Sequence, residues 1–465
     1  MERLRFSPAI LLALCLLAAN AAYCQPISWE ELSKESWELS KQGNFNDAVT
    51  AAKKALKAAS DEFGPRNTKL IALLNQITYL YKSKGMYKEA EPFVKRALAV
   101  RTLSIDGPVT KQDYADIYKA MKDLYEIYKL ENKLPHAGKA LRRAIIMEEK
   151  ASGPGSPEAI SDTKELIALY EAQGKISRVE PMYRKVIAMQ EKSLGPDHPD
   201  TADTMNSLSA VYRAEGRFAE AEELLKKVVA VTEKNSGPDS PQLPTYLNNL
   251  ATIYFYQKRP VEAEELLKRS LAIDEDRFGP DSTEIVPALN NLATVYTRQR
   301  KFSEAQALYK RAIGIMTKSL GPEDIRLAKY MNNLAAIYAY QKRYSEAEAV
   351  YRQVFDMQKK SLAPDASGQA ASFYDMAVLY GSQGRYQEAE EYYKKAAEIA
   401  GRAPDSAAAS LFRDALTNLA ASYKAQGKYS EAEDALKNLI EAQQRAAGKD
   451  ASGSAEAIRS LISLY

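Results

Sequence analysis

The sequence has almost none of the residues that disulfides and metal sites need. Its 465 residues include two cysteines and two histidines. Both cysteines, Cys15 and Cys24, fall within the first 24 residues, so a chain that loses this segment keeps one cysteine at most and cannot form an internal disulfide. For His136 and His198, which have no cysteine nearby, a surface or capping role is far commoner than a metal-ligating or catalytic one. Stability must therefore come from packing.

The chain also lacks an excess of charge and any signature of catalysis. Lys and Arg number 64 against 61 for Asp and Glu, which gives a net charge of +3 and indicates no nucleic-acid partner. There is no Gly-rich phosphate loop, no G-x-S-x-G and no H-E-x-x-H motif. We therefore expect a protein that is not an enzyme, with no catalytic residue, no metal site and no cofactor.

The only long apolar stretch lies at the N-terminus. Arg3 and Arg5 precede the apolar run Ala9–Ala19, which is followed by small residues. This pattern is typical of a cleaved secretory signal, and cleavage after Ala21 or after Cys24 fits it. The run is too short to span a bilayer, and no later segment approaches the required length. Residues 1–24 are therefore predicted to be a signal peptide, and the mature chain to be periplasmic or secreted with no transmembrane segment.

What the sequence has in abundance is repetition. The octapeptide LNNLATIY at 247–254 returns as LNNLATVY at 289–296 and as MNNLAAIY at 331–338. Gly-Pro pairs recur at the same interval of 42 residues between Gly153 and Gly321. A fixed period of this length is the signature of a repeat architecture.

Each repeat reads as two helices. In the first helix Leu247, Leu250, Ala251 and Tyr254 form one apolar stripe. A polar turn follows, in which a left-handed glycine ends the helix, with Asn132 in the third repeat. The second helix ends at Gly-Pro. The helix-starting turns fit capping boxes that pair Ser303 with Gln306, Ser345 with Glu348, and Ser430 with Glu433.

The second helices also carry many carboxylates, as in EAEELLKRS. We expect these to lie on solvated helix faces with a cation one turn later, as for Glu264 with Lys268 and Glu265 with Arg269.

The predicted fold is all-α: a right-handed α-solenoid of about ten helical hairpins plus a C-terminal single helix, in one solenoid over residues 25–465. The hairpins are expected at about 29–61, 68–104, 111–150, 158–194, 200–236, 242–278, 284–320, 326–362, 368–402 and 407–447, with the last helix at 454–465.

Small residues recur where the two helices of a hairpin should cross, as at Ala251 and Ala263. The third and fourth repeats break this pattern with Tyr125 and with Ile167 facing Val179, so looser or shifted packing is expected there. At the ends, Trp29 and Trp37 could seal the first hairpin, and Ile462 stands where alanine is usual.

The positions of the small residues, the tyrosine three residues later and the alanine early in the second helix resemble the tetratricopeptide repeat. The 42-residue spacing, LNNLA and EAEELLKRSLAIDE resemble the kinesin light chain variety of that repeat. The resemblance implies a superhelix whose first helices line a concave groove, with groove asparagines and basic residues that hold peptides. No heptad run precedes the repeats here, and the export signal favours an exported bacterial type.

The repeated asparagines are the main functional signal. With the apolar stripe turned inward, the opposite face of the first helices should form the groove, where an asparagine can hydrogen-bond a peptide backbone through both its donor and its acceptor. The alternative is that these are solvated positions retained by duplication. The candidate peptide-binding residues are Asn206, Asn248, Asn249, Thr252, Tyr256, Asn290, Asn291, Arg298, Asn332, Asn333, Tyr340 and Asn418.

Three functions remain open from the sequence, and the least favoured, a hydrolase or transferase, would need a single deep pocket with convergent titratable groups. The favoured one is a non-enzymatic protein–protein interaction module that binds peptide segments or partner subunits in the groove. The alternative is a structural scaffold or self-associating assembly factor that acts through its ends or its convex face. The sequence identifies neither the partner nor the oligomeric state.

Overall fold

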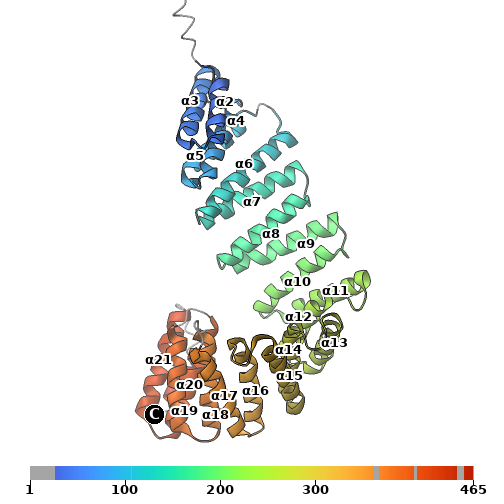
Figure 1. Cartoon of the computed structure of the whole chain (residues 1–465), viewed down its shortest axis with the longest axis vertical. Helices are drawn as coiled ribbons and strands as arrows, with labels where there is room; N and C mark the ends of the chain where they lie inside the picture. The colour runs from blue at the N-terminus through green and yellow to red at the C-terminus, as the bar shows by residue number, and fades with distance from the viewer. Residues whose placement is uncertain (1–26, 106, 361–365, 403–405, 448–454, 464–465) are drawn as a thin grey trace, which may run out of the picture. The chain divides into compact units, whose positions relative to one another are not determined.

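A computed structural model describes residues 27–105, 107–360, 366–402, 406–447 and 455–463. In this part of the chain the secondary structure is helical and contains no strand, and 21 α-helices follow one another in consecutive pairs (Figure 1). The predicted all-α solenoid of helical hairpins is confirmed. The signal peptide predicted at residues 1–24 lies outside the described residues.

The chain forms two compact units that meet at Glu215 and Gly216. The helices of unit 1 are α2 (Trp29–Lys41), α3 (Phe45–Phe63), α4 (Leu70–Ser83), α5 (Tyr87–Leu103), α6 (Lys111–Leu130), α7 (Leu134–Ala151), α8 (Pro157–Ala172), η1 (Ile176–Arg178), α9 (Val179–Ser193) and α10 (Pro199–Ala214). Each described hairpin begins and ends close to the bounds that the sequence predicts. That all of residues 25–465 form a single solenoid stays a prediction.

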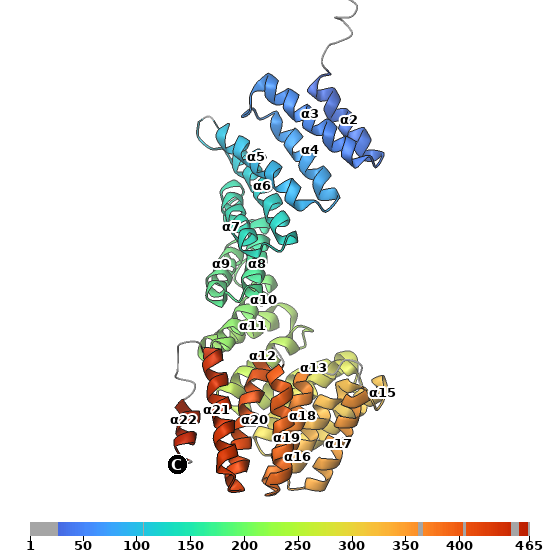
Figure 2. The same ribbon diagram turned by 90° about the vertical axis from the view of Figure 1, so that its left-hand side faces the viewer.

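Unit 2 continues the same pattern, and Figure 2 shows its helices stacked side by side. Its helices are α11 (Phe218–Ser236), α12 (Leu243–Tyr256), α13 (Pro260–Phe278), η2 (Thr283–Ile285), α14 (Val286–Arg298), α15 (Phe302–Leu320), η3 (Ile325–Leu327), α16 (Ala328–Tyr340), α17 (Tyr344–Lys360), α18 (Ala366–Ser382), α19 (Tyr386–Arg402), α20 (Ser406–Ala425), α21 (Tyr429–Ala447) and α22 (Ala455–Ile462).

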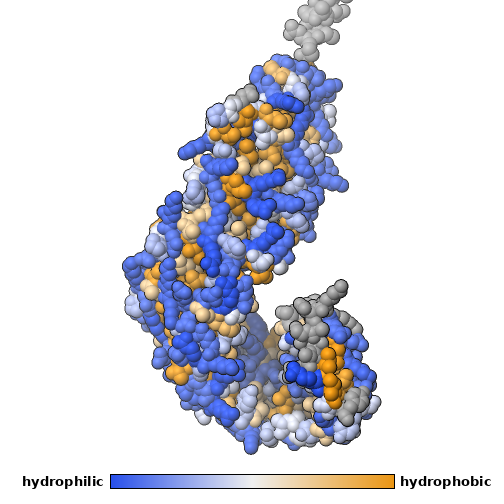
Figure 3. All heavy atoms as spheres, turned by 180° about the vertical axis from the view of Figure 1, so that it is seen from behind, coloured by the Kyte–Doolittle hydropathy of each residue, from blue (hydrophilic) through white to orange (hydrophobic). Residues whose placement is uncertain are grey.

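The core consists of the predicted apolar stripes. In α12 the residues Leu247, Leu250, Ala251 and Tyr254 are all buried, and Ala263 of α13 is completely inaccessible. Because an alanine at the crossing leaves room for the opposing backbone, the paired helices approach closely and keep their larger side chains above and below the crossing. Most of the face seen in Figure 3 is hydrophilic, as expected if the apolar stripes are turned inward.

Left-handed residues end the first helices, as predicted. The glycine of this turn has positive φ in six repeats, and so does Asn132 in the third; the glycines are Gly43, Gly85, Gly174, Gly216, Gly384 and Gly427. Three further turns have no glycine: Lys258, Arg300 and Lys342 occupy the left-handed region at φ of 62°, 60° and 60°. A long side chain in this conformation costs roughly 1 kcal/mol or more relative to glycine, so these turns are locally strained.

The predicted capping boxes are wrong. Helix α15 begins at Phe302, and its N-cap, Lys301, makes no side-chain cap hydrogen bond. Ser303 therefore lies inside the first turn, and the same holds for Ser345 in α17 and Ser430 in α21. The aromatic residue before each serine is the first helical residue, so each helix begins two positions upstream of the start that a serine N-cap would give.

The unusual repeats behave differently from each other. Tyr125 is buried, and the contact of α6 with α7 is the most extensive of any helix pair, so the prediction of looser packing is wrong there. In the next repeat the chain makes the 3-10 turn η1 before α9 begins at Val179, and shifted packing of Ile167 against Val179 stays a prediction. At the N-terminus the Trp29 ring packs edge-on against Phe63, whereas Trp37 stays partly exposed beside Tyr79.

One carboxylate of each EAE segment is not on a solvated face. Glu264 is 8% exposed and binds both Lys268 (2.6 Å) and Lys301 of the next hairpin (2.7 Å). The predicted Glu264–Lys268 pair is confirmed, but Arg269 binds Glu233 of the preceding hairpin instead of Glu265. The sequence expectation fails because Arg269 faces the preceding hairpin, so its carboxylate partner comes from another repeat.

The same arrangement joins other hairpins. We call Glu91, Glu222, Glu264, Glu348 and Glu390 the junction glutamates, because each pairs with a cation one turn later and with a cation of the following hairpin. Burial alone would raise the pKa of Glu264, but hydrogen bonds from Lys268, Lys301 and Gln299 outweigh it and hold this pKa at about 2. Gln306 occupies the corresponding slot in α15 and accepts from Arg343.

Replacing a junction glutamate should destabilise unit 2 in a pH-dependent way. We expect Glu264→Gln to lower the free energy of unfolding by about 1–2 kcal/mol near neutral pH, since two cations lose their partner. The folded pKa lies below the ordinary value of 4.5, so the difference between wild type and variant is full above that pH and shrinks as the pH falls toward 2. Urea unfolding at several pH values measures it. Glu265→Gln, at the exposed neighbouring position, is the control; an equal loss there would contradict the assignment.

Candidate functional site

The repeated asparagines lie on the first helices of unit 2, but they are not free, solvated side chains. Asn290 of α14 is buried, with 8% of its surface exposed, and Asn248, Asn291, Asn332 and Asn333 are half-buried. Their side chains therefore have partners within the protein. These asparagines are therefore neither unpaired groups that wait for a ligand nor solvated positions without a structural role.

Asparagines of successive repeats bind each other. Asn291 donates from Nδ2 to Oδ1 of Asn248 on the preceding first helix (3.2 Å), and Asn333 donates in the same way to Asn290 (3.1 Å). The second asparagine of one repeat is thus paired with the first asparagine of the repeat before it. We call this series the asparagine ladder. It fixes the register of α12, α14 and α16 against one another.

The first asparagine of each pair is held further by its own surroundings. Asn248 donates to the Pro244 carbonyl and to the Ser270 hydroxyl, both at 2.7 Å. Asn332 donates to Ser372 Oγ of α18 at 2.9 Å. The side-chain Nδ2 groups of Asn248 and Asn332 are therefore committed to contacts within the protein.

Three cavities open along this surface of unit 2. The largest, of about 520 Å³, lies where α12, α14, α15 and α16 come together. It is lined by Phe255, Thr294, Thr297, Arg298, Arg300, Phe302, Tyr309, Asn333, Ala336 and Tyr340. None of these is an acid, and the cavity carries two guanidinium groups. We call it the arginine cavity.

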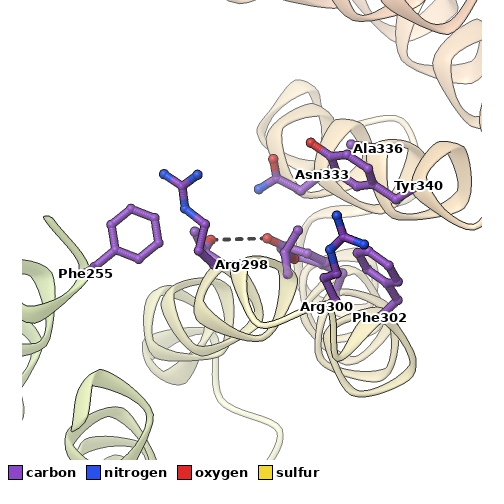
Figure 4. A pocket seen from close by; sticks show the side chains of 10 residues that line it. Phe255, Arg298, Arg300, Phe302, Asn333, Ala336 and Tyr340 are labelled. Carbon is purple, nitrogen blue, oxygen red and sulfur yellow. Dashed lines mark hydrogen bonds between the residues drawn. The ribbon is translucent and has the colours of Figure 1, made fainter. Parts of the chain in front are cut away.

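The arginine cavity has aromatic walls. Figure 4 shows Phe255 on one side of Arg298, with Phe302, Tyr340 and Asn333 on the other side of the opening. The guanidinium carbon of Arg298 lies 5.0 Å from the centre of the Phe255 ring, and the rings of Phe302 and Tyr340 stack at 5.6 Å. Aromatic faces hold such cations in place without neutralising them.

The two arginines have no counter-charge. Within the described part of the chain, neither Arg298 nor Arg300 forms an ion pair with a carboxylate. In Figure 4 the guanidinium group of Arg298 lies on the side of Phe255, and that of Arg300 lies beside Phe302. This is unlike Arg259 and Arg343, each of which pairs with acids or amides of its own unit. The free charges leave the arginine cavity with an attraction for an anion.

The predicted site residues divide between these cavities. Arg298, Asn333 and Tyr340 meet in the arginine cavity, whereas Thr252, Tyr256 and Asn291 line a smaller cavity of about 180 Å³ between α12 and α14. Asn332 and Asn333 line a third cavity, of about 460 Å³. Asn206 belongs to unit 1, and Asn418 of α20 donates to the Tyr374 hydroxyl. Asn249 makes contacts of its own and lines none of the three.

Seven of the ten residues that line the arginine cavity were not predicted from the sequence, Arg300 and Phe302 among them. Phe302 was assigned only to a helix start, and Arg300 was not considered at all. The signal for Arg300 was present, since it occupies the slot where most repeats have glycine.

The described residues hold no group of three or more His, Cys, Asp or Glu side chains placed to bind a metal ion. Among the described helices, none combines the length and the apolar character needed to cross a membrane.

The asparagine ladder should contribute measurably to stability. We expect Asn290→Ala to lower the free energy of unfolding by about 1–3 kcal/mol, because Asn290 is buried and its loss leaves a donor of Asn333 unpaired. A double-mutant cycle with Asn333→Ala should give a coupling of about 0.5–1.5 kcal/mol in chemical denaturation. Asn438→Ala, at an exposed position of α21, is the control. Strictly additive effects of the two ladder variants would contradict the ladder.

Comparison with known proteins agrees with this architecture. The tetratricopeptide repeat family matches residues 39–102, 158–234, 208–276, 284–360, 326–402 and 413–450, which is well over half of the chain. No curated protein matches the chain.

Among solved structures, the apo form of RapI has 15% identity and a TM-score of 0.53, covering 82% of this chain and 99% of its own. The nearly identical TPR-like repeats of a protein described as a kinesin light chain in Podosopora anserina have 25% identity and a TM-score of 0.38, covering 43% of this chain and 96% of theirs. A tetratricopeptide repeat protein from Parabacteroides merdae has 16% identity and a TM-score of 0.46, covering 64% and 98%. At these identities RapI supports the fold alone. The family matches show that this chain belongs to the tetratricopeptide repeat family.

Proposed function

We propose that unit 2 binds an extended, acidic segment of a partner protein across the arginine cavity. Membership of the tetratricopeptide repeat family supports a protein–protein interaction scaffold. The observation that carries the finer proposal is the pair of guanidinium groups, Arg298 and Arg300, that open into a cavity without a carboxylate. A carboxylate side chain of the segment would form a charge-assisted hydrogen bond with either of them.

The other walls suit a peptide. Tyr340 of the arginine cavity and Tyr256 of the smaller cavity are 64% and 54% exposed, and each is backed by a stacked phenylalanine, Phe302 and Phe218. Rigid, exposed tyrosines provide contact area at low entropic cost. Asn333 keeps its Oδ1 acceptor after donating to the ladder, so it can accept from a backbone amide of the segment.

The strained turns support the importance of positive charge here. Lys258, Arg300 and Lys342 hold left-handed conformations that glycine would adopt at lower cost, and they belong to the three repeats that carry the asparagine pair. Strain that persists in a fold is often stored at a functional site. A cation at the end of three successive first helices is consistent with an anionic partner along this edge.

The remaining parts of the proposal rest on the sequence. The signal-like residues 1–24 favour export to the periplasm or the cell exterior, where the module would act without catalysis and without a cofactor.

The arginines should decide the binding preference. In a display library of random dodecapeptides selected on the immobilised mature chain, we expect enrichment of Asp and Glu. Arg298→Ser should weaken the selected peptides about tenfold in fluorescence anisotropy, since one charge-assisted hydrogen bond is lost. Arg300→Gly should weaken them similarly while raising the free energy of unfolding by roughly 0.5–1 kcal/mol, because the turn strain is relieved.

A loss of binding that accompanies a gain in stability cannot come from misfolding. Lys359→Ser, which removes an exposed cation of α17 outside the cavity, is the matched control. The proposal fails if selected peptides have no excess of acids, or if Arg298→Ser and Lys359→Ser bind them equally well.

A second candidate is a scaffold that self-associates through its C-terminal end. It is favoured by α22, where Ile458 and Ile462 are 39% and 66% exposed on a helix whose main contact is with α21. Light scattering after size exclusion should then show a concentration-dependent oligomer that Ile462→Glu disperses. A monomer at all concentrations would exclude this candidate and leave the peptide-binding proposal unaffected.

A further inference from the structure

The third cavity of unit 2 differs in chemistry from the arginine cavity beside it. It measures about 460 Å³ and lies among η3, α16, α17 and α18. It is lined by Ile325, Arg326, Ala328, Lys329, Asn332, Asn333, Gln358, Gly368, Ala371 and Asp375. Asn333 lines both cavities, so the two adjoin.

Asp375 is the only acid in this lining, and it has no partner. It forms no hydrogen bond and no ion pair with any described residue. Burial raises the pKa of its carboxyl to about 7. The titratable groups that sense it are Tyr351 of α17 and its chain neighbour Tyr374, and its charge acts to raise the pKa of both hydroxyls. An acid without a counter-charge in a cavity of this size is an unusual and costly feature.

The cations of the same cavity do not satisfy Asp375. Arg326 is held in a two-bond ion pair with Asp324, at 2.9 and 2.7 Å. Lys329 is exposed and lies near the Tyr330 ring, 5.9 Å from its centre. Neither cation lowers the pKa of Asp375, because burial is the only cause of its shift.

Two more acceptors beside the cavity lack donors. The side-chain oxygens Oδ1 of Asn332 and Oε1 of Gln358 are buried and have no hydrogen-bond partner among the described residues. Their orientation is fixed, because the Gln358 amide donates to the Gly368 carbonyl and the Asn332 amide donates to Ser372 Oγ. Gln358 as a whole is 6% exposed. Asp375, Asn332 and Gln358 all line this cavity, so its lining has an excess of hydrogen-bond acceptors.

We propose that this cavity receives the guanidinium or ammonium group of a basic side chain, which ion-pairs with Asp375 and donates to the amide oxygens of Asn332 and Gln358. The inference rests on the proposed function and deepens it. The bound segment then carries an acid at the arginine cavity and a base at the adjoining one, so that a charge pattern rather than acidity alone selects the partner.

The cavity can be tested with single-residue probes, without any peptide. Saturation-transfer NMR on the mature chain should detect N-acetyl-L-arginine amide or N-acetyl-L-lysine amide, and show at least fivefold less transfer to N-acetyl-L-citrulline amide, the uncharged isostere of arginine. Asp375→Asn should abolish the difference between arginine and citrulline. Transfer to the arginine probe should rise from about pH 6 to about pH 8 as Asp375 ionises.

Lys359→Gln is the control, because it removes an exposed cation of α17 that does not line this cavity, and it should leave the transfer unchanged. Thermal unfolding checks that both variants fold. Equal transfer to citrulline and arginine, or full transfer in Asp375→Asn, would overturn the proposal. So would displacement of the arginine probe by millimolar CaCl₂, since the site would then belong to an inorganic cation. None of these outcomes depends on the acidic peptides, so failure here is distinct from failure at Arg298 and Arg300.

Discussion

Each hairpin can bury its apolar faces only against the hairpins beside it, so the stability of every repeat depends on its junctions. Apolar contact supplies most of the energy but does not by itself fix a unique alignment, because alanine and leucine stripes can slide past one another. The junction glutamates remove this freedom on the second helices. Each holds a cation of its own helix and one of the next hairpin, as Glu264 holds Lys268 and Lys301, so a slipped register would leave a partly buried charge unpaired.

The asparagine ladder has the corresponding role on the first helices. Asn291 and Asn333 reach back to Asn248 and Asn290, so amide pairs set the spacing of α12, α14 and α16. An amide carries both a donor and an acceptor and has no net charge, so it can connect to its neighbour and still offer an acceptor to a ligand. The same residues can therefore align the helices and line the surface along which the cavities open.

The features that depend on local periodicity could be predicted from the sequence. The apolar stripes, the left-handed turns and the alanine crossings can each be recognised within one repeat, and each recurs in the next repeat. Contacts between repeats were harder to predict. That Arg269 binds Glu233, or that Asn291 binds Asn248, depends on how far one hairpin rotates against another, and a shift of one turn would exchange the partners. Arg300 was missed for a related reason, since a cation in a turn has meaning only once the adjoining aromatic residues are in place.

The arginine cavity and the Asp375 cavity share one wall but oppose each other in charge, and this placement has a physical consequence. Arginines without counter-ions repel each other, and an acid without a counter-ion is costly to bury, yet the fold does not let the two neutralise one another. Asn333, held to Asn290 by the ladder, stands in both linings. On the proposed function, the attraction of each cavity therefore stays available to a partner with the complementary charge pattern.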